Sequence, residues 1–286
     1  MSKLHLCFIV EERYRRSRFP MAVADQLTGL GHEITILEPH VNLVNFTELV
    51  GDRRVDAVVL RTVSGGPGLS LHEAAAASGI TTINDAQSVR RVRDKVVAAA
   101  VAHAHDIPFA RTYLVTRAVL LEQLPDQSFP LVIKPNVGGF GHGIRVLRTR
   151  EEAGDLDPAW FAGGYLVAQP WVPNTGDDIK LYNTGQGIHA VRRRSPLLDP
   201  ADGPRELVPL TPALRRLAQR VGYAFGLHLY GVDVVRGPQG WVAIDVNDFP
   251  SFGMVPNAVD MVTKTVLDIA RRGAVRPSGS AGLAVS

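Results

Sequence analysis

Short apolar runs alternate with helical patterns along the first third of the chain. Strands that alternate with helices are typical of βαβ units, which build a parallel sheet with right-handed crossovers. In such sheets ligands gather outside the carboxyl ends of the strands. The segments at that edge are the loops after Val10 and Leu60 and the turn Asn84-Asp85. The predicted strands cover 4–10, 32–37, 55–61 and 80–83, and the predicted helices cover 21–30, 46–50 and 71–78.

Hairpin patterns replace this alternation in the rest of the chain. Two strands flank a glycine-rich loop, and a second pair flanks the turn 236–240, which predicts two antiparallel hairpins. Strands over 166–172, 179–184 and 188–193 also look antiparallel. The hairpin strands cover 129–134 with 144–147 and 229–235 with 241–246, a further strand covers 112–115, and helices cover 86–104, 118–124, 212–225 and 257–270. The Gly/Ser/Ala/Pro-rich segment 272–286 predicts a disordered tail.

Composition narrows the class of protein. The length of 286 residues suggests about two domains, or one large domain with an insertion. Apolar residues make up 45% of the chain, which is enough to offset the conformational entropy that keeps disordered chains unfolded. The net charge of +3 does not mark a nucleic-acid binder. The single Cys7 excludes an intramolecular disulfide and a Cys-based zinc site, and favours a reducing, cytoplasmic location. The run 4–10 is too short to span a membrane.

The string Asp245-Val246-Asn247 is the strongest chemical signal. Residues two apart on a strand share a face, so Asp245 and Asn247 point the same way, while Ile244 and Val246 are expected on the core face. Asp233 on the partner strand supplies a third oxygen. Mg²⁺ commonly binds through one or two carboxylates together with substrate phosphates, so these three residues are candidate metal ligands. A hairpin with solvent-facing acids is the alternative.

Lys134 ends a buried strand and precedes a glycine-rich loop over 136–143. Backbone amides in such a loop can approach phosphate oxygens, and a nearby ammonium supplies charge. The spacing is neither that of a P-loop nor that of a Rossmann fingerprint. A flexible hairpin tip is the alternative. The glycines of this loop that we take as candidate phosphate contacts are Gly138, Gly139, Gly141 and Gly143.

Two clusters of cations add further candidates. The triplet Arg93-Asp94-Lys95 lies in the predicted helix 86–104, where such a run is usually a solvated face. In the run 192–194, strand alternation places Arg193 on one face and its two neighbours on the other. An arginine that points into a cleft can bind a carboxylate or a phosphate through two parallel hydrogen bonds.

In their order and spacing these motifs resemble the ATP-grasp enzymes, and within them the RimK-type carboxylate–amine ligases. The resemblance extends to about residue 270. It depends on motifs spread over the chain, namely Asn84, Arg93-Asp94-Lys95, 129–134 with its glycine loop, Gln169-Pro170-Trp171-Val172, Asp178-Ile179-Lys180, the arginine run, Gly231-Val232-Asp233 and 245–250.

The resemblance implies the α/β ATP-grasp fold, with ATP held between two antiparallel sheets. It implies an N-terminal parallel α/β domain (1–88), a small central α+β subdomain whose glycine loop is the lid (89–166), and a C-terminal α+β subdomain with an antiparallel sheet (167–271), followed by the tail. It also implies site roles. Lys95, Lys134 and the loop glycines would contact the phosphates, and Gln169, Trp171 and Val172 would contact the adenine. Asp233, Asp245 and Asn247 would bind Mg²⁺ (or Mn²⁺), and the catalytic cations Lys180 and Arg193 would contact the substrate or a phosphate.

These roles imply an ADP-forming ligase that phosphorylates a carboxylate to an acylphosphate, which an amine then attacks. Its partners are a small molecule or peptide end with a carboxylate and an amine acceptor, without nucleic acid or membrane, and a homo-oligomer is possible. Arg13, Arg16 and Arg61 follow predicted strands and suit an anionic substrate, although a solvated basic loop explains any one of them equally well.

The C-terminal motif departs from the RimK pattern. RimK-type ligases usually have Glu at the position of Asp245 and small residues at 248 and 249. The string from Asp245 to Pro250, and 193–197, look more like the inositol-polyphosphate kinases, which share the fold. A kinase that phosphorylates a hydroxyl of a polyanion is therefore the alternative. A nucleotide-binding module without catalysis is a third hypothesis.

Overall fold

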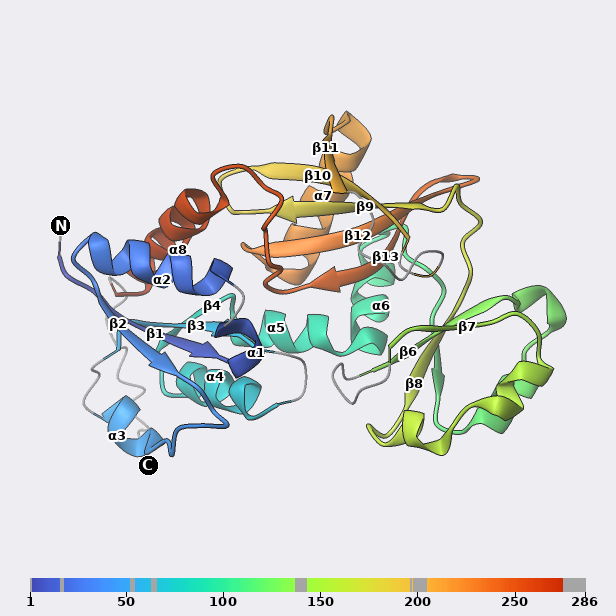
Figure 1. Ribbon diagram of the computed structural model, residues 1–286, viewed down its shortest axis with the longest axis horizontal. Helices are drawn as coiled ribbons and strands as arrows, with labels where there is room; N and C mark the ends of the chain where they lie inside the picture. Colours follow the sequence, from blue (N-terminus) through green and yellow to red (C-terminus); the bar gives the residue numbers. More distant parts are fainter. Residues whose placement is uncertain are drawn as a thin grey trace, which may run out of the picture.

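The computed structural model describes residues 2–15, 18–51, 55–62, 66–136, 143–195, 197 and 205–274. Three sheets organise these residues (Figure 1). An N-terminal parallel sheet has the strand order β2-β1-β3-β4, a central antiparallel sheet has the order β5-β8-β6-β7, and a C-terminal antiparallel sheet has the order β11-β10-β9-β12-β13. The predicted α/β class is therefore confirmed.

The N-terminal sheet is buried on both faces, as parallel sheets usually are. Leu6 and Phe8 of β1 point toward α2 and α8, whereas Cys7 and Ile9 point toward α3, α4 and α5. This explains why β1 reads as a continuous apolar run. The elements are β1 (His5–Val10), α1 (Glu12–Arg15), α2 (Arg18–Gly29), β2 (Glu33–Leu37), α3 (Phe46–Gly51), β3 (Ala57–Arg61), α4 (Pro67–Ala77), β4 (Thr81–Ile83), α5 (Ala86–Arg93) and α8 (Ala258–Ala274).

The central sheet forms a separate small lobe, at the lower right of Figure 1. Its own core contains Leu131 and Ile133 from β6, Leu147 from β7 and Leu166 from β8. Short 3₁₀ segments cover this core at 118–123, 126–128, 151–155 and 158–161. The strands are β5 (Tyr113–Val115), β6 (Leu131–Pro135), β7 (Arg145–Leu147) and β8 (Leu166–Pro170).

The C-terminal sheet packs one face against α7 and α6. Apolar residues of α7, such as Leu217 and Val221, meet Leu181 and Val232 from the sheet. Thr211 caps the start of α7, and Gly226 ends it in the left-handed conformation at φ 70°. The elements are α6 (Lys95–Ala104), β9 (Asp177–Asn183), β10 (Ile188–Arg194), β11 (Arg205–Val208), α7 (Pro212–Phe225), β12 (Tyr230–Gly237) and β13 (Gly240–Asn247).

Several predicted elements differ from the structure. The helix predicted over 86–104 is two helices, because Asp94 leaves the helical conformation and caps α6. The strand predicted over 166–172 is antiparallel as expected, and it pairs with β5 and β6 in the central sheet rather than with β9 or β10. The segment predicted as a helix over 118–124 is 3₁₀, and β11 was not predicted.

The three sheets occupy 5–83, 113–170 and 177–247. The division into domains at 88, 166 and 271 remains a prediction. Residues 275–286 of the predicted tail lie outside the described residues, whereas 272–274 belong to α8. In the described part of the chain, no helix is both long and apolar enough to cross a membrane.

Candidate active site

A cavity of about 250 Å³ lies between the central and C-terminal sheets. Both sheets contribute side chains to it, so the cavity exists only because the two lobes face each other. One end is apolar and the other is charged. The central lobe and the segment that leaves it supply Val132, Lys134, Ile144, Gln169, Trp171, Val172 and Asn174, and the C-terminal sheet with its flanking residues supplies Asp178, Arg193, Ser195, Asp233, Val235, Ile244 and Asp245.

Lys134 connects the two sheets. It lies on β6, is only 6% exposed, and its Nζ donates a hydrogen bond to the Ile244 carbonyl of β13 at 2.9 Å. Burial lowers the pKa of this ammonium, and the nearby carboxylates of Asp245 and Asp233 oppose that effect. A buried ammonium with unused donors suits an anionic ligand in the cavity.

Asp233 and Asp245 face each other directly across β12 and β13. Asp233 accepts hydrogen bonds from Lys180 Nζ at 3.1 Å, Arg193 Nη2 at 3.1 Å and Asn247 Nδ2 at 3.2 Å. Burial alone would raise the pKa of Asp233, but the charges of Lys180 and Arg193 outweigh it, and the pKa is lowered. The structure thus brings together all three predicted metal ligands and both predicted catalytic cations.

The donor chemistry of this set fits Mg²⁺. Two carboxylates and one amide oxygen lie on neighbouring positions of a strand pair, and Mg²⁺ takes few protein oxygens when phosphates and water complete its shell. Clusters of three or more His, Cys, Asp or Glu side chains suited to a metal do not occur among the described residues, so no competing site of that kind is found there.

Ile244 lies on the opposite side from the one predicted. The register between β12 and β13 shifts at Asp233 and Val234, so Ile244 is the extra residue of a β-bulge. It therefore lines the cavity together with Asp245, while Val246 remains in the core as predicted. Strand alternation holds only where the pairing is regular.

Asp178 is a cavity residue for which the sequence predicts no role. This residue is 3% exposed, lines the cavity, and has a buried Oδ1 without a hydrogen-bond partner. Burial raises the pKa of Asp178, although Arg193 Nη2 lies 3.7 Å from Oδ2. In the sequence it stands out only as part of the motif Asp178-Ile179-Lys180.

The apolar end of the cavity contains the predicted adenine segment. Gln169 is 4% exposed and donates from Nε2 to Thr112 Oγ1 at 3.0 Å. The backbone of Trp171 donates to the Pro130 carbonyl at 2.8 Å, which extends the β6–β8 pairing by one residue. Val172 lies beside them. Apolar lining residues next to strand backbone suit a planar base such as adenine.

Lys95 lies at the edge of this arrangement rather than in the cavity lining. Asp94 accepts hydrogen bonds from the first amides of α6, and Asn136 Oδ1 accepts from the Lys95 amide at 2.9 Å. Lys95 Nζ donates to the Asn136 carbonyl at 3.2 Å, which holds it beside the start of the glycine loop. Of the four loop glycines, Gly143 is described and exposed, and Gly138, Gly139 and Gly141 lie outside the described residues.

Arg61 ends β3 at the carboxyl edge of the N-terminal sheet. Its guanidinium carbon lies 3.9 Å from the centre of the Tyr14 ring and 6.0 Å from that of Phe249. Burial lowers the pKa of Arg61, and its Nε has no hydrogen-bond partner. Of the other substrate candidates, Arg16 and the side chain of Arg13 lie outside the described residues.

Solved structures share this arrangement of lobes. The crystal structure of a RimK domain ATP-grasp protein from Sphaerobacter thermophilus has a TM-score of 0.70 and 19% identity, covering 92% of this chain and 99% of that one. The chain has the ATP-grasp fold. D-alanine–D-alanine ligase from Bacillus anthracis in complex with ATP gives a TM-score of 0.69 at 14% identity, covering 95% of this chain and 99% of that one.

Sequence comparisons find similarity to a ligase over most of the chain and to a kinase domain family over a shorter segment. A probable alpha-L-glutamate ligase from Shewanella baltica is 25% identical over 272 residues, covering 86% of this chain and 89% of that protein. The family model described as the inositol 1,3,4-trisphosphate 5/6-kinase ATP-grasp domain matches residues 198–268. The predicted resemblance to ATP-grasp enzymes of RimK type is confirmed. The kinase family model covers the predicted kinase-like string 245–250 but not the one at 193–197.

Proposed function

We propose that this chain is an ATP-dependent, ADP-forming carboxylate–amine ligase. The observation that supports it most is the charged end of the cavity, where Lys134, Lys180 and Arg193 surround the facing pair Asp233 and Asp245. Such an arrangement can bind a metal and phosphates without a protein nucleophile, and phosphoryl transfer needs chiefly positioning and charge neutralisation. The ligase class agrees with the relatives found.

Different residues would bind different parts of the nucleotide and the metal. Gln169, Trp171 and Val172 would hold the adenine, and Lys134, Lys95 and the glycine loop the phosphates. Asp233, Asp245 and Asn247 would hold Mg²⁺, and Mn²⁺ is an alternative with the same oxygen ligands. The metal, when bound, neutralises charge on the transferred phosphoryl group. Lys180 and Arg193 would then exchange contacts with Asp233 for contacts with phosphate or substrate.

The reaction has two steps. A carboxylate oxygen of the substrate attacks the γ-phosphorus, giving an acylphosphate and ADP. The amine nitrogen then attacks the carbonyl carbon, the phosphate leaves, and the nitrogen releases a proton. Arg61, with Arg13 and Arg16, would bind the anionic substrate, which we propose to be a small molecule or a peptide end. We also propose that the protein forms a homo-oligomer and is cytoplasmic. The single, fully buried Cys7 supports the cytoplasmic location, where thiols stay reduced.

A kinase is the second candidate function. The kinase-related family model covers both strands that carry the metal ligands. The string from Asp245 to Pro250 carries the same resemblance. In this alternative the γ-phosphoryl group would pass to a hydroxyl of a polyanion and remain on the product.

One assay separates the candidates. The protein is incubated with ATP, Mg²⁺ and pooled carboxylates, with and without pooled amines that include glutamate, and ADP, free phosphate and new masses are followed. A ligase produces ADP and phosphate in equal amounts together with an amide. A kinase produces ADP and a phosphorylated product without free phosphate. Nucleotide binding without turnover in any pool would favour a non-catalytic module and contradict the proposal.

A further inference from the structure

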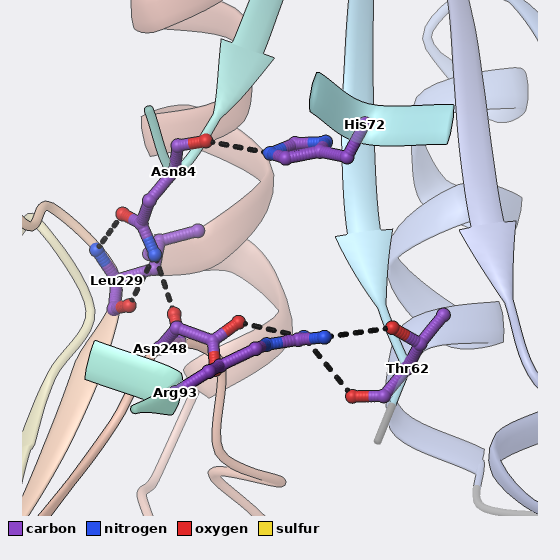
Figure 2. Close-up of polar contacts among 6 residues, drawn as sticks. All are labelled: Thr62, His72, Asn84, Arg93, Leu229 and Asp248. Carbon is purple, nitrogen blue, oxygen red and sulfur yellow. Dashed lines mark hydrogen bonds and ion pairs between the residues drawn. The ribbon is translucent and has the colours of Figure 1, made fainter. Parts of the chain in front are cut away.

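A buried network of hydrogen bonds connects the N-terminal sheet to the hairpin that contains the candidate metal ligands. We call this network, formed by Arg93, Asn84, Asp248 and Thr62, the joint. Figure 2 shows its two halves, one around Arg93 and one around Asn84, which both reach Asp248. Asp248 directly follows Asn247, the last residue of β13. The joint therefore touches the metal-ligand strand at its end without supplying a ligand.

Arg93 forms the first half of the joint. It is 7% exposed, and its Nε and Nη2 donate to the two carboxylate oxygens of Asp248 at 3.2 and 2.9 Å. Its Nη1 and Nη2 also donate to the hydroxyl and carbonyl of Thr62, each at 3.1 Å. The guanidinium lies between these partners in Figure 2. A planar fork with several fixed donors holds both neighbours in a defined orientation.

Asn84 forms the second half. Its Oδ1 accepts from the amides of His228 and Leu229, both at 2.9 Å, and its Nδ2 donates to the Leu229 carbonyl at 2.7 Å and to the Asp248 carbonyl. Leu229 directly precedes β12, the strand of Asp233. One buried amide at the end of β4 thus holds the start of β12 and the end of β13.

Several candidate site residues lie directly beside the joint. Thr62 follows Arg61, the candidate substrate contact, and Asp248 follows Asn247, the candidate metal ligand. Arg93 also precedes Asp94, which begins α6 and with it Lys95. Reacting groups must be placed within fractions of an ångström for efficient transfer, so a rigid connection between these elements has a direct chemical consequence.

We propose that Arg93, Asp248 and Asn84 are positioning residues that orient the metal-binding hairpin against the substrate edge of the N-terminal sheet. This inference depends on the proposed function, because it assumes that Asp233, Asp245 and Asn247 hold the metal. None of the three side chains lines the nucleotide cavity, so each acts through the residues it holds.

The test uses two conservative variants, Asp248→Asn and Arg93→Lys, in the full chain. Affinity for ADP is measured by calorimetry in EDTA and in Mg²⁺, and the ratio of the two affinities reports the metal site. We expect ADP affinity in EDTA to stay at the wild-type value, and the gain from Mg²⁺ to fall about 10-fold or more, as for other residues that orient metal ligands. Melting temperatures and circular dichroism establish that the variants fold.

The matched control is Glu73→Gln. Glu73 on α4 forms an exposed ion pair at 2.9 Å with Arg90 of α5, the helix that also contains Arg93. Neither residue lines the cavity, so this variant should keep the full Mg²⁺ gain. A full Mg²⁺ gain in both joint variants overturns the inference, and so does an equal loss of ADP affinity in EDTA and in Mg²⁺, which marks a merely structural role. The proposed function is tested separately by the turnover assay described above, and it fails if the wild type shows no turnover.

Discussion

At the scale of single residues, burial and neighbouring charge oppose each other throughout the site. Desolvation raises the pKa of Asp178, whereas at Asp233 the cations Lys180 and Arg193 outweigh it and the pKa is lowered. At Lys134 burial lowers the pKa, and the carboxylates of Asp245 and Asp233 oppose that effect. Each ionised group therefore depends on its neighbours, and removing one changes the protonation of the rest.

His72 gives a prediction for acid stability. This side chain is fully buried on α4, and its Nε2 hydrogen-bonds with the Asn84 carbonyl at 2.9 Å. Burial lowers the pKa of His72 from 6.5 to about 4, against the opposing effect of that hydrogen bond. Between these two values the unfolded chain binds the proton more readily, so stability is complete above pH 6.5 and falls as the pH drops toward 4, by about 3 kcal/mol.

Denaturant titrations of the wild type and of His72→Gln across this pH range measure the effect. The variant should lose less stability between pH 6.5 and 4 than the wild type, whatever its stability at pH 7. His103 on the exposed face of α6 provides the control, and His103→Gln should follow the wild-type curve. Parallel curves for the wild type and His72→Gln would contradict the assignment.

At the scale of elements, the break between α5 and α6 decides where Lys95 lies. Asp94 accepts from the amides of Val96 and Val97 at 3.0 and 3.1 Å and from the hydroxyl of Tyr165 at 2.7 Å. An aspartate directly before an Ala/Val run is an N-cap signal, and it was present in the sequence. The apolar spacing continues through both helices, which is why a single helix was predicted.

Asp94→Ala should therefore have two effects. Loss of the cap should lower the free energy of unfolding by about 1 kcal/mol. Because Lys95 begins the helix that Asp94 caps, ADP affinity should fall as well. Thr211→Ala removes the cap of α7, remote from the cavity, and should lower stability while leaving ADP affinity unchanged. If Asp94→Ala loses stability but binds ADP like the wild type, the cap does not position Lys95. Urea denaturation and calorimetry supply both measurements.

At the scale of the whole molecule, the candidate ligand site closes only when two lobes are folded. Lys134 comes from the central sheet and Asp233 from the C-terminal sheet, so a ligand that contacts both should stabilise the folded chain. With Mg²⁺ and ADP at about a hundredfold excess over the dissociation constant, the melting temperature should rise by about 5 °C. ADP in EDTA should give a smaller rise.

Asp245→Asn isolates the contribution of the metal to this shift. The variant should keep the shift that ADP causes in EDTA and lose the additional shift from Mg²⁺. The control is Asp260→Asn on α8. Asp260 is an exposed carboxylate that does not line the cavity, so this variant should behave as the wild type. A wild-type Mg²⁺ shift in Asp245→Asn would show that this carboxylate does not hold the ion.

Local pattern was sufficient to predict most elements and to single out the candidate metal ligands. The helix over 212–225 has the observed bounds, and the hairpin of β12 and β13 follows from alternation and a turn signal. The bulge at Ile244, which neither signal predicts, brings Asp233 opposite Asp245. Alternation along β10 predicts that Arg193 and its two neighbours lie on opposite faces, and the structure directs Arg193 toward Asp233. These features depend on interactions between residues that are near in sequence, or on a single strand pair.

Tertiary structure decided the features that depend on distant segments. The pairing of β8, the bulge at Ile244, and the burial of Asp178 and Arg93 are features that the local pattern did not predict. In the sequence Arg93 looked like part of a solvated helix face, and its carboxylate partner lies 155 residues away. The apolar pattern thus determined the α/β class and the strands that carry the ligands, because it reflects local burial. How those strands meet was decided only in the folded chain, because charges at a joint are stabilised by partners that no local pattern specifies.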